Sequence, residues 1–266
     1  MMSTDGHDVE GVRIETYGEP SSRPPMLLVH GGTQGSWAWE RIAPHLAQDG
    51  WYTVCLNWFG HHGSAQLPGP ERLSRSILDV TQEIGIVASG LARPPVLVGH
   101  SMGGLAALAY AASHPVAALV LLTPVVPRGF ADRSIPVPVD PDAPWRPPDA
   151  QVDALFWDEV DPADAARYRA LIAPQSPRAV LEATRWWLDV DVDVDAVTVP
   201  TFMVASASDL LVPAPYVESL AARMGARCRT LVGRGGHGVP LNPVWRDVAD
   251  EMIQWCRATF DDQRAA

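Results

Sequence analysis

Short, continuous apolar runs alternate with helical periods along most of this 266-residue chain, and this alternation constrains its fold most strongly. Runs such as MLLV at 26–29 and ALVLL at 118–122 contain no polar residue. Such strands suit a sheet that is covered on both faces, which means mainly parallel strands. Parallel strands need crossover connections, so the sequence predicts an α/β protein with a mostly parallel, doubly wound sheet flanked by helices.

The predicted elements follow one another in the order that this architecture requires. We expect strands at 12–16, 26–29, 52–57, 96–98, 118–122, 202–205 and 228–232. We expect helices near 38–48, 73–89, 102–113, 215–224 and 244–260. The last helix is the clearest, because apolar residues recur on one helical face, at Val244, Val248, Met252, Trp255 and Cys256.

The alternation is interrupted after residue 123. Eight prolines lie between Thr123 and Pro148, and no strand or long helix can run through them. Residues 149–188 then show helical patterns, such as PADAARYRALIA. The sequence therefore predicts an inserted helical cap with a Pro-rich entry at 124–188, and a core formed by 1–123 and 189–266. The alternating aspartates from 189 to 195 lack the glycine and glutamate of a calcium loop, and we interpret them as the solvated face of a linker.

Composition restricts the class of partner. The formal net charge is −11 and the chain has no basic run, which argues against nucleic-acid binding. Three cysteines without metal-like spacing predict neither a disulfide framework nor a zinc site. The polar, acidic first residues do not resemble a signal peptide, and no apolar run is long enough to span a membrane. We expect a cytoplasmic monomer or homodimer that acts on a small molecule, with no membrane insertion.

One serine stands at a strand-to-helix junction, in the stretch VGHSMGG at 98–104. Its pattern G-x-S-x-G is typical of a sharp turn that holds a nucleophile above a sheet edge. Glycine at positions 99, 103 and 104 avoids collisions that side chains would cause in such a turn. The sequence therefore predicts Ser101 as a nucleophile.

A serine hydroxyl needs a base, and the base needs an orienting group. His237 lies in a glycine-rich loop after the strand that ends near Val232, and Asp209 follows the strand that ends near Ala205. Both loops leave the sheet at the edge where Ser101 is expected. We predict that Ser101 attacks, that His237 moves the proton, and that Asp209 orients His237.

A catalytic serine also needs donors for the oxyanion that forms on its substrate. The stretch HGGT at 30–33 directly follows a strand, so a free backbone N–H there can face Ser101. We predict the N–H groups of Gly32 and Met102 as the oxyanion hole, with Thr33 as a lesser candidate that contacts substrate. His30, His61, His62 and His100 are interpreted as structural.

The chain has ten tryptophans, several of them in the loops and the predicted cap that would roof the pocket. Two interpretations stay open, an aromatic substrate cavity and ordinary packing. As substrate-binding candidates we take Trp37, Trp58, Trp157 and Trp187. The sequence has no metal cluster, phosphate loop or dinucleotide fingerprint, so no metal and no cofactor are predicted.

These motifs, in this order, resemble the α/β-hydrolase fold superfamily: HGG after one strand, GHHGSA after the next, then GHSMGG, SDLLVP and GGHGVPLNP. The resemblance spans nearly the whole chain and implies a lysophospholipase-like or carboxylesterase-like serine hydrolase with a helical cap. One departure is Asn57, where the family usually has aspartate. Ser101 stands where the dehalogenases of this superfamily have aspartate, so the resemblance implies neither dehalogenation nor epoxide opening.

The sequence thus predicts a hydrolase that cleaves an apolar ester, thioester or lactone through an acyl-enzyme. Two alternatives stay open at this point. The Ser–His pair could act as the base of a lyase or cyclase on a natural product, or the scaffold could be a non-hydrolytic small-molecule binding protein.

Overall fold

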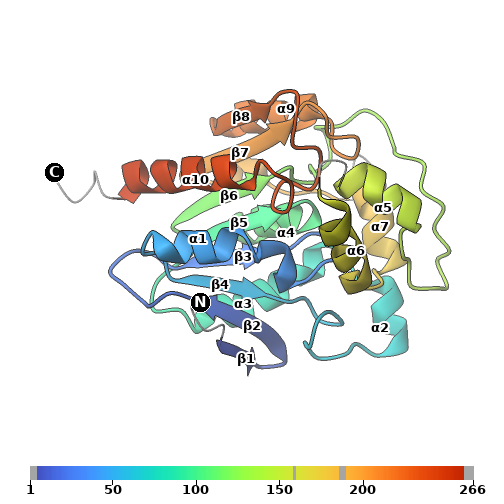
Figure 1. Ribbon diagram of the computed structural model, residues 1–266, viewed down its shortest axis with the longest axis horizontal. Helices are drawn as coiled ribbons and strands as arrows, with labels where there is room; N and C mark the ends of the chain where they lie inside the picture. The colour runs from blue at the N-terminus through green and yellow to red at the C-terminus, as the bar shows by residue number, and fades with distance from the viewer. Residues whose placement is uncertain (1–4, 158–159, 186–189, 261–266) are drawn as a thin grey trace.

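The computed structural model describes residues 5–157, 160–185 and 190–260. Its centre is an eight-stranded sheet in the order β1-β2-β4-β3-β5-β6-β7-β8 (Figure 1). The pairs β1–β2 and β2–β4 are antiparallel, and all the others are parallel. The strands are β1 Asp5–Val9, β2 Val12–Tyr17, β3 Met26–Val29, β4 Thr53–Leu56, β5 Val96–His100, β6 Ala118–Leu122, β7 Thr201–Ser206 and β8 Arg227–Leu231. The predicted mostly parallel sheet is confirmed.

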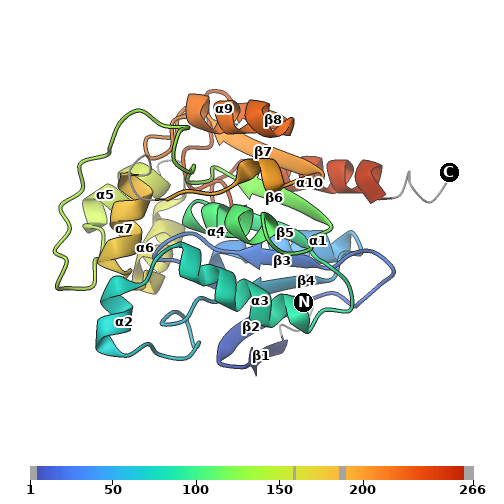
Figure 2. The ribbon, with the colours of Figure 1, turned by 180° about the vertical axis from the view of Figure 1, so that it is seen from behind.

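Helices cover both faces of the sheet. The α-helices are α1 Ile42–Gln48, α2 Gly69–Ser74, α3 Thr81–Ser89, α4 Met102–Ala111, α5 Asp149–Phe156, α6 Pro162–Leu171, α7 Pro177–Thr184, α9 Ala214–Met224 and α10 Trp245–Phe260. Short 3₁₀ helices are η1 Ser36–Trp39, η2 Leu78–Val80 and η3 Val194–Ala196. Helices α1 and α10 lie together on one face (Figure 1), and α3, α4 and α9 lie on the other (Figure 2). No helix in these ranges is long and apolar enough to cross a bilayer.

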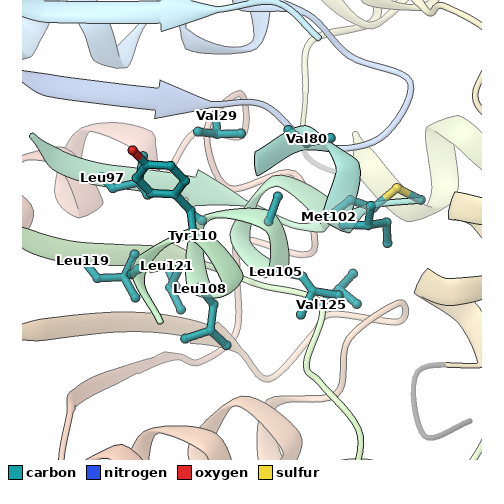
Figure 3. Close-up of a cluster of buried hydrophobic side chains, with 14 of the residues drawn as sticks. Val29, Val80, Leu97, Met102, Leu105, Leu108, Tyr110, Leu119, Leu121 and Val125 are labelled. Atoms are coloured by element: carbon teal, nitrogen blue, oxygen red, sulfur yellow. The ribbon is translucent and has the colours of Figure 1, made fainter. Parts of the chain in front are cut away.

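The core explains why the central strands β3 and β6 are apolar throughout. In β3, Leu27 and Val29 face the α4 side, whereas Met26 and Leu28 face the α1 side. Figure 3 shows the α4 side, where Leu105 and Leu108 of α4 pack near side chains of β3, β5 and β6. Full burial of one such leucine contributes roughly 1.5–3 kcal/mol. Because both faces of the central strands β3 and β6 are covered, a polar side chain at any position in them would be buried.

Two parts of the fold differ from the sequence prediction. Strand β1 was not predicted, because DGHDV is polar; it pairs with β2 at the edge through a turn in which Glu10 and Gly11 both have positive φ. The helix predicted at 73–89 is divided into α2, η2 and α3. The backbone is extended at Arg75, and the Asp79 carboxylate then accepts the Ser76 N–H at 2.8 Å, which starts a new helical turn.

The chain between β6 and β7 forms an insertion, here residues 124–200, which carries α5, α6 and α7. These helices lie beyond the carboxyl ends of the parallel strands (Figures 1 and 2). Ser176 Oγ donates to Leu73 O at 2.9 Å, and Glu182 accepts from Ser76 Oγ and the Ile77 N–H, so α7 is tied to the core near α2. The division at 124 and 188 stays a prediction, since residues 186–189 lie outside the described ranges.

The aspartates of the predicted linker are solvated at 191, 193 and 195, but the segment is not extended throughout. It forms the 3₁₀ turn η3, and Asp195 pairs with Arg223 of α9. Asp189 lies outside the described residues.

Candidate active site

Ser101 occupies a strained turn between β5 and α4. Its φ is 54° and its ψ is −123°, a conformation that costs a non-glycine residue about 1–3 kcal/mol. The turn is so tight that a Cβ on Gly99 would lie 2.5 Å from Gly103 O, and one on Gly103 would lie 2.2 Å from His30 O. The glycines in G-x-S-x-G are therefore required by close backbone approach, and the turn presents the serine at the sheet edge.

The structure brings the three predicted side chains into one hydrogen-bonded chain. His237 Nε2 lies 2.8 Å from Ser101 Oγ, and His237 Nδ1 lies 2.8 Å from Asp209 Oδ2. The other carboxylate oxygen, Oδ1, accepts the N–H groups of Leu211 and Val212 at 2.8 and 2.9 Å. All three members of the chain are buried. Since a carboxylate only accepts, the proton between Asp209 and His237 sits on Nδ1, and Nε2 accepts from the serine hydroxyl.

The loop that carries His237 is held by residues next to the nucleophile. The His237 carbonyl accepts from His100 Nε2 at 2.9 Å and from Thr123 Oγ1 at 3.1 Å. Complete burial lowers the pKa of His100 to about 3, so its ring is neutral near pH 7 and has one N–H. We assign this proton to Nε2, which makes the shorter contact, so Nδ1 is an unprotonated nitrogen 3.2 Å from Gln34 Oε1. The Phe156 ring packs edge-on against His237, with centroids 5.4 Å apart. The imidazole is thus fixed from the core and from the insertion.

The loop after β3 includes the backbone N–H of Gly32, whose two neighbouring N–H groups are hydrogen-bonded. The Gly31 N–H donates to Gln34 Oε1 at 3.0 Å, and the Thr33 N–H donates to Gln175 Oε1 at 3.1 Å. In the described part of the chain, no acceptor is bonded to the Gly32 N–H between them. Gly32 lines the same pocket as Ser101 and Met102. The N–H of Thr33, the lesser candidate, is therefore already used, whereas that of Gly32 is available.

His30 and Asn57 hold this loop in place. His30 Nδ1 donates to Gly31 O at 2.8 Å, and its Nε2 accepts the Trp58 N–H at 3.2 Å. Burial lowers the pKa of His30 well below its usual value, which matches a neutral ring with one donor and one acceptor. Asn57, which departs from the family pattern, accepts the Ser36 N–H at 2.7 Å and donates to Arg13 O at 3.2 Å. An amide makes both bonds, whereas a carboxylate could only accept.

A pocket lies above Ser101, which forms part of its lining. Its wall is mainly aliphatic and aromatic, with side chains from the insertion and from the loop after β7, among them Val125, Ile135, Trp145, Val180, Ala183 and Leu211. No Asp, Glu, Lys or Arg of the described residues lines it. A charged group on a ligand would lose its hydration there without gaining a partner.

The tryptophans occupy other places than predicted. Trp37 stacks on Tyr168 and donates to His62 Nε2 at 2.9 Å, and Trp58 is fully buried and stacked on His30. Trp157 packs in a separate cluster under α5 and α6. These three do not line the pocket, because each ring packs between other elements; Trp37 is partly buried there, and Trp58 and Trp157 are buried. Trp145 does line the pocket. Trp187 lies outside the described residues.

Sequence reasoning missed Gln34 and Gln175, whose amides accept from the loop after β3. It also missed Ile135 and Val137 as pocket residues. The alternation of apolar residues with polar residues and prolines in SIPVPVD was a signal for one apolar face there. Gln175 offered no signal, because its contact with Thr33 joins residues 142 positions apart.

Comparisons with known proteins agree with this fold. The putative carbamate hydrolase RutD of Caulobacter segnis is 30% identical over 265 residues, which cover 86% of this chain and 91% of that protein. The lipase LipV of Mycobacterium tuberculosis is 28% identical over 250 residues, covering 86% of this chain and 92% of LipV. The solved structure of a putative lipase from Acinetobacter baumannii has a similar fold, with a TM-score of 0.75 at 17% identity over 98% of this chain and 93% of that one. The model of the alpha/beta hydrolase family matches residues 26–251, and the chain belongs to this family.

Proposed function

We propose that this protein is a serine hydrolase that cleaves uncharged esters, thioesters or lactones with an apolar acyl group, through an acyl-enzyme on Ser101. The observation that carries the proposal is the chain from Ser101 through His237 to Asp209, placed at the floor of a pocket whose described lining has no charged side chain. The similarity to a lipase supports ester cleavage. The similarity to a putative carbamate hydrolase makes carbamates the substrates to compare against.

The geometry gives each residue one role in the reaction. Ser101 Oγ attacks the carbonyl carbon while its proton passes to His237 Nε2, and Asp209 stabilises the imidazolium through Nδ1. The carbonyl oxygen becomes an oxyanion, which the N–H groups of Gly32 and Met102 receive. Met102 is the first residue of α4, so the positive end of that helix also favours the charge.

The second half of the reaction reverses these transfers. His237 returns the proton to the leaving oxygen or sulfur, which frees the alcohol or thiol. A water molecule then loses a proton to His237 Nε2 and attacks the acyl carbon, and Ser101 leaves with that proton. The apolar wall, including Val180 and Ala183 of α7, holds the acyl group during both steps. The insertion thus acts as a cap over the site.

Steady-state kinetics on p-nitrophenyl esters test this function. The panel comprises acetate, butyrate and octanoate esters, a carbamate, and a half-ester that matches octanoate in length but ends in a carboxylate. We expect octanoate to exceed the charged half-ester by about 100-fold in kcat/KM, since a hydrated carboxylate enters an apolar pocket unpaired.

Ser101→Ala supplies the second arm, with Ser113→Ala at the exposed far end of α4 as the matched control. We expect Ser101→Ala to lower kcat by about 10⁴-fold or more and Ser113→Ala to leave it within about twofold. Turnover that survives in Ser101→Ala, or a preference for the charged half-ester, would contradict the proposal.

A further inference from the structure

The insertion reaches the loop of the proposed oxyanion hole through one short segment, residues 173–175. Thr33 O accepts the Ala173 N–H at 2.9 Å, and the Thr33 N–H donates to Gln175 Oε1 at 3.1 Å. Both polar groups of the Thr33 backbone are therefore held by the segment between α6 and α7. Gln175 is 2% exposed, so water does not compete for its amide oxygen.

A third element meets the same oxygen. His61, in the loop after β4, has its Nε2 at 3.2 Å from Gln175 Oε1. Because a backbone N–H donates to this atom, it is the amide oxygen and not the nitrogen, and His61 must donate to it from Nε2. Burial lowers the pKa of His61 to about 4, so the ring is neutral near pH 7 and carries one proton. Its other nitrogen, Nδ1, lies 3.3 Å from the Phe59 carbonyl oxygen, so the tautomer that is protonated at Nε2 donates to Gln175 and makes no hydrogen bond to Phe59.

The backbone of Gln175 is fixed as firmly as its side chain. It exchanges two hydrogen bonds with Trp145, N–H to carbonyl in both directions at 2.8 Å. Trp145 is itself part of the pocket wall. Gln175 thus joins the pocket wall, the loop after β4 and the loop after β3 at one point.

Thr33 needs such support. Its φ is 62°, in the left-handed region that a β-branched residue rarely adopts. The Gly32 N–H lies between two backbone N–H groups that are held in place. Gln34 binds the Gly31 N–H and Gln175 binds the Thr33 N–H, so the position of the Thr33 peptide affects the direction of the Gly32 N–H. Release of Thr33 would let the Gly32 N–H turn away from Ser101.

We propose that Gln175 is a positioning residue, which orients the Gly32 N–H toward the reacting carbonyl only while the insertion is seated on the core. The inference rests on the proposed function and deepens it. The same insertion carries Val180, Ala183 and Thr184 in the pocket wall, so an acyl chain that packs on α7 also stabilises the seated arrangement. Longer apolar acyl groups should therefore raise kcat, in addition to lowering KM.

The test variant is Gln175→Met, which keeps the length and volume of the side chain but removes the acceptor. Ser176→Ala is the matched control, because Ser176 is the next residue and also bonds the insertion to the core, at Leu73 O, without touching the loop after β3. We expect Gln175→Met to lower kcat for the octanoate ester by about 10–100-fold with KM within about threefold, because an oriented oxyanion donor contributes about 10²–10³ in rate. We expect Ser176→Ala to keep kcat within about threefold.

Two further measurements separate positioning from general loosening. The affinity for a trifluoromethyl ketone, whose hemiketal oxyanion needs the same donors, should fall in Gln175→Met in parallel with kcat. Hydrogen exchange of a peptide covering residues 30–36 should accelerate in Gln175→Met and not in Ser176→Ala. His61→Phe keeps a ring at this position but removes the second donor to Gln175, together with the Nδ1 contact to the Phe59 carbonyl. It should show the same kcat-specific loss at smaller size, and it replaces Gln175→Met as the test if that variant does not fold.

Equal kcat for Gln175→Met and Ser176→Ala, or a loss that falls on KM alone, would overturn the inference while the Ser101-dependent hydrolysis of the wild type still stood. If the wild type hydrolysed no ester, the proposed function would fail. The rate at which a fluorophosphonate modifies Ser101 would then test the inference. In this step Ser101 Oγ displaces fluoride from phosphorus and its proton passes to His237. The P=O oxygen binds the same N–H donors as the oxyanion. An unchanged rate in Gln175→Met would overturn it.

Discussion

The sheet edge and the insertion build the site in different ways. At the edge, the three side chains of the hydrogen-bonded chain follow directly from strand ends, within nine residues of β5, β7 or β8. The insertion acts through contacts between distant residues, such as Gln175 with Thr33 and Phe156 with His237. Under the proposed function, the groups that make and break bonds belong to the sheet edge. The insertion supplies most of the pocket wall and the contacts with the loop after β3.

The largest expected effect concerns the residues at the sheet edge, which should control kcat. We expect Asp209→Asn to lower kcat by about 10³–10⁴-fold with KM nearly unchanged, because an amide cannot both accept from Nδ1–H and stabilise the imidazolium. Single-turnover kinetics with the octanoate ester would measure this. Asp195→Asn, in the solvated linker, is the control and should behave as wild type. A loss of less than about tenfold in Asp209→Asn would remove Asp209 from the mechanism.

A smaller effect tests the insertion. Ala183→Phe, on the α7 wall, should lower kcat/KM for the octanoate ester by about 10–100-fold and leave the acetate ester within about threefold, since only the longer acyl chain reaches that wall. Ala170→Phe, on the exposed side of α6, is the matched control. Equal losses for both esters would show that α7 does not select the acyl chain.

The smallest expected effect concerns His100 and the dependence of the free energy of unfolding on pH. The pKa of His100 is about 3 in the folded chain against 6.5 ordinarily, so the unfolded chain binds more protons between these values. The free energy of unfolding therefore carries the full contribution of neutral His100 above about pH 6.5. This contribution declines as the pH falls toward 3, and at about pH 5 the loss from this ring is about 2 kcal/mol.

His100→Gln keeps a donor for the His237 carbonyl but cannot titrate. Urea unfolding at about pH 7.5 and about pH 5 should show that the loss of free energy of unfolding is about 2 kcal/mol smaller in this variant than in the wild type. The same loss in both proteins would mean that His100 is not the buried base that the structure places there.

The same two regions explain what the sequence could predict. Parallel strands and the order of Ser101, Asp209 and His237 were predictable, because each depends on a pattern within about ten residues and on the common edge where parallel strands end. The role of the Gly32 N–H as an oxyanion donor stays a prediction. Edge strand β1 could not be predicted, because a strand at an exposed edge needs no apolar side chains.

Contacts between residues far apart in the sequence could not be predicted from local patterns. Trp37, Trp58 and Trp157 were expected at the pocket, but each found a packing partner elsewhere, as Trp58 did on His30. Nothing in the sequence near Gln175 indicates that it would meet Thr33 and His61. Such residues are set by how the insertion lies on the core, which is a property of the folded chain alone.

In the proposed mechanism, Ser101 carries the acyl group transiently as an acyl-enzyme. The most direct measurement is mass spectrometry of the protein quenched within milliseconds of mixing with the p-nitrophenyl octanoate ester, followed by peptide mapping. The account predicts one octanoyl group per chain, on the peptide that contains Ser101, appearing before steady-state product and absent from Ser101→Ala. Turnover without any adduct on that peptide, or an adduct that persists in Ser101→Ala, would contradict it.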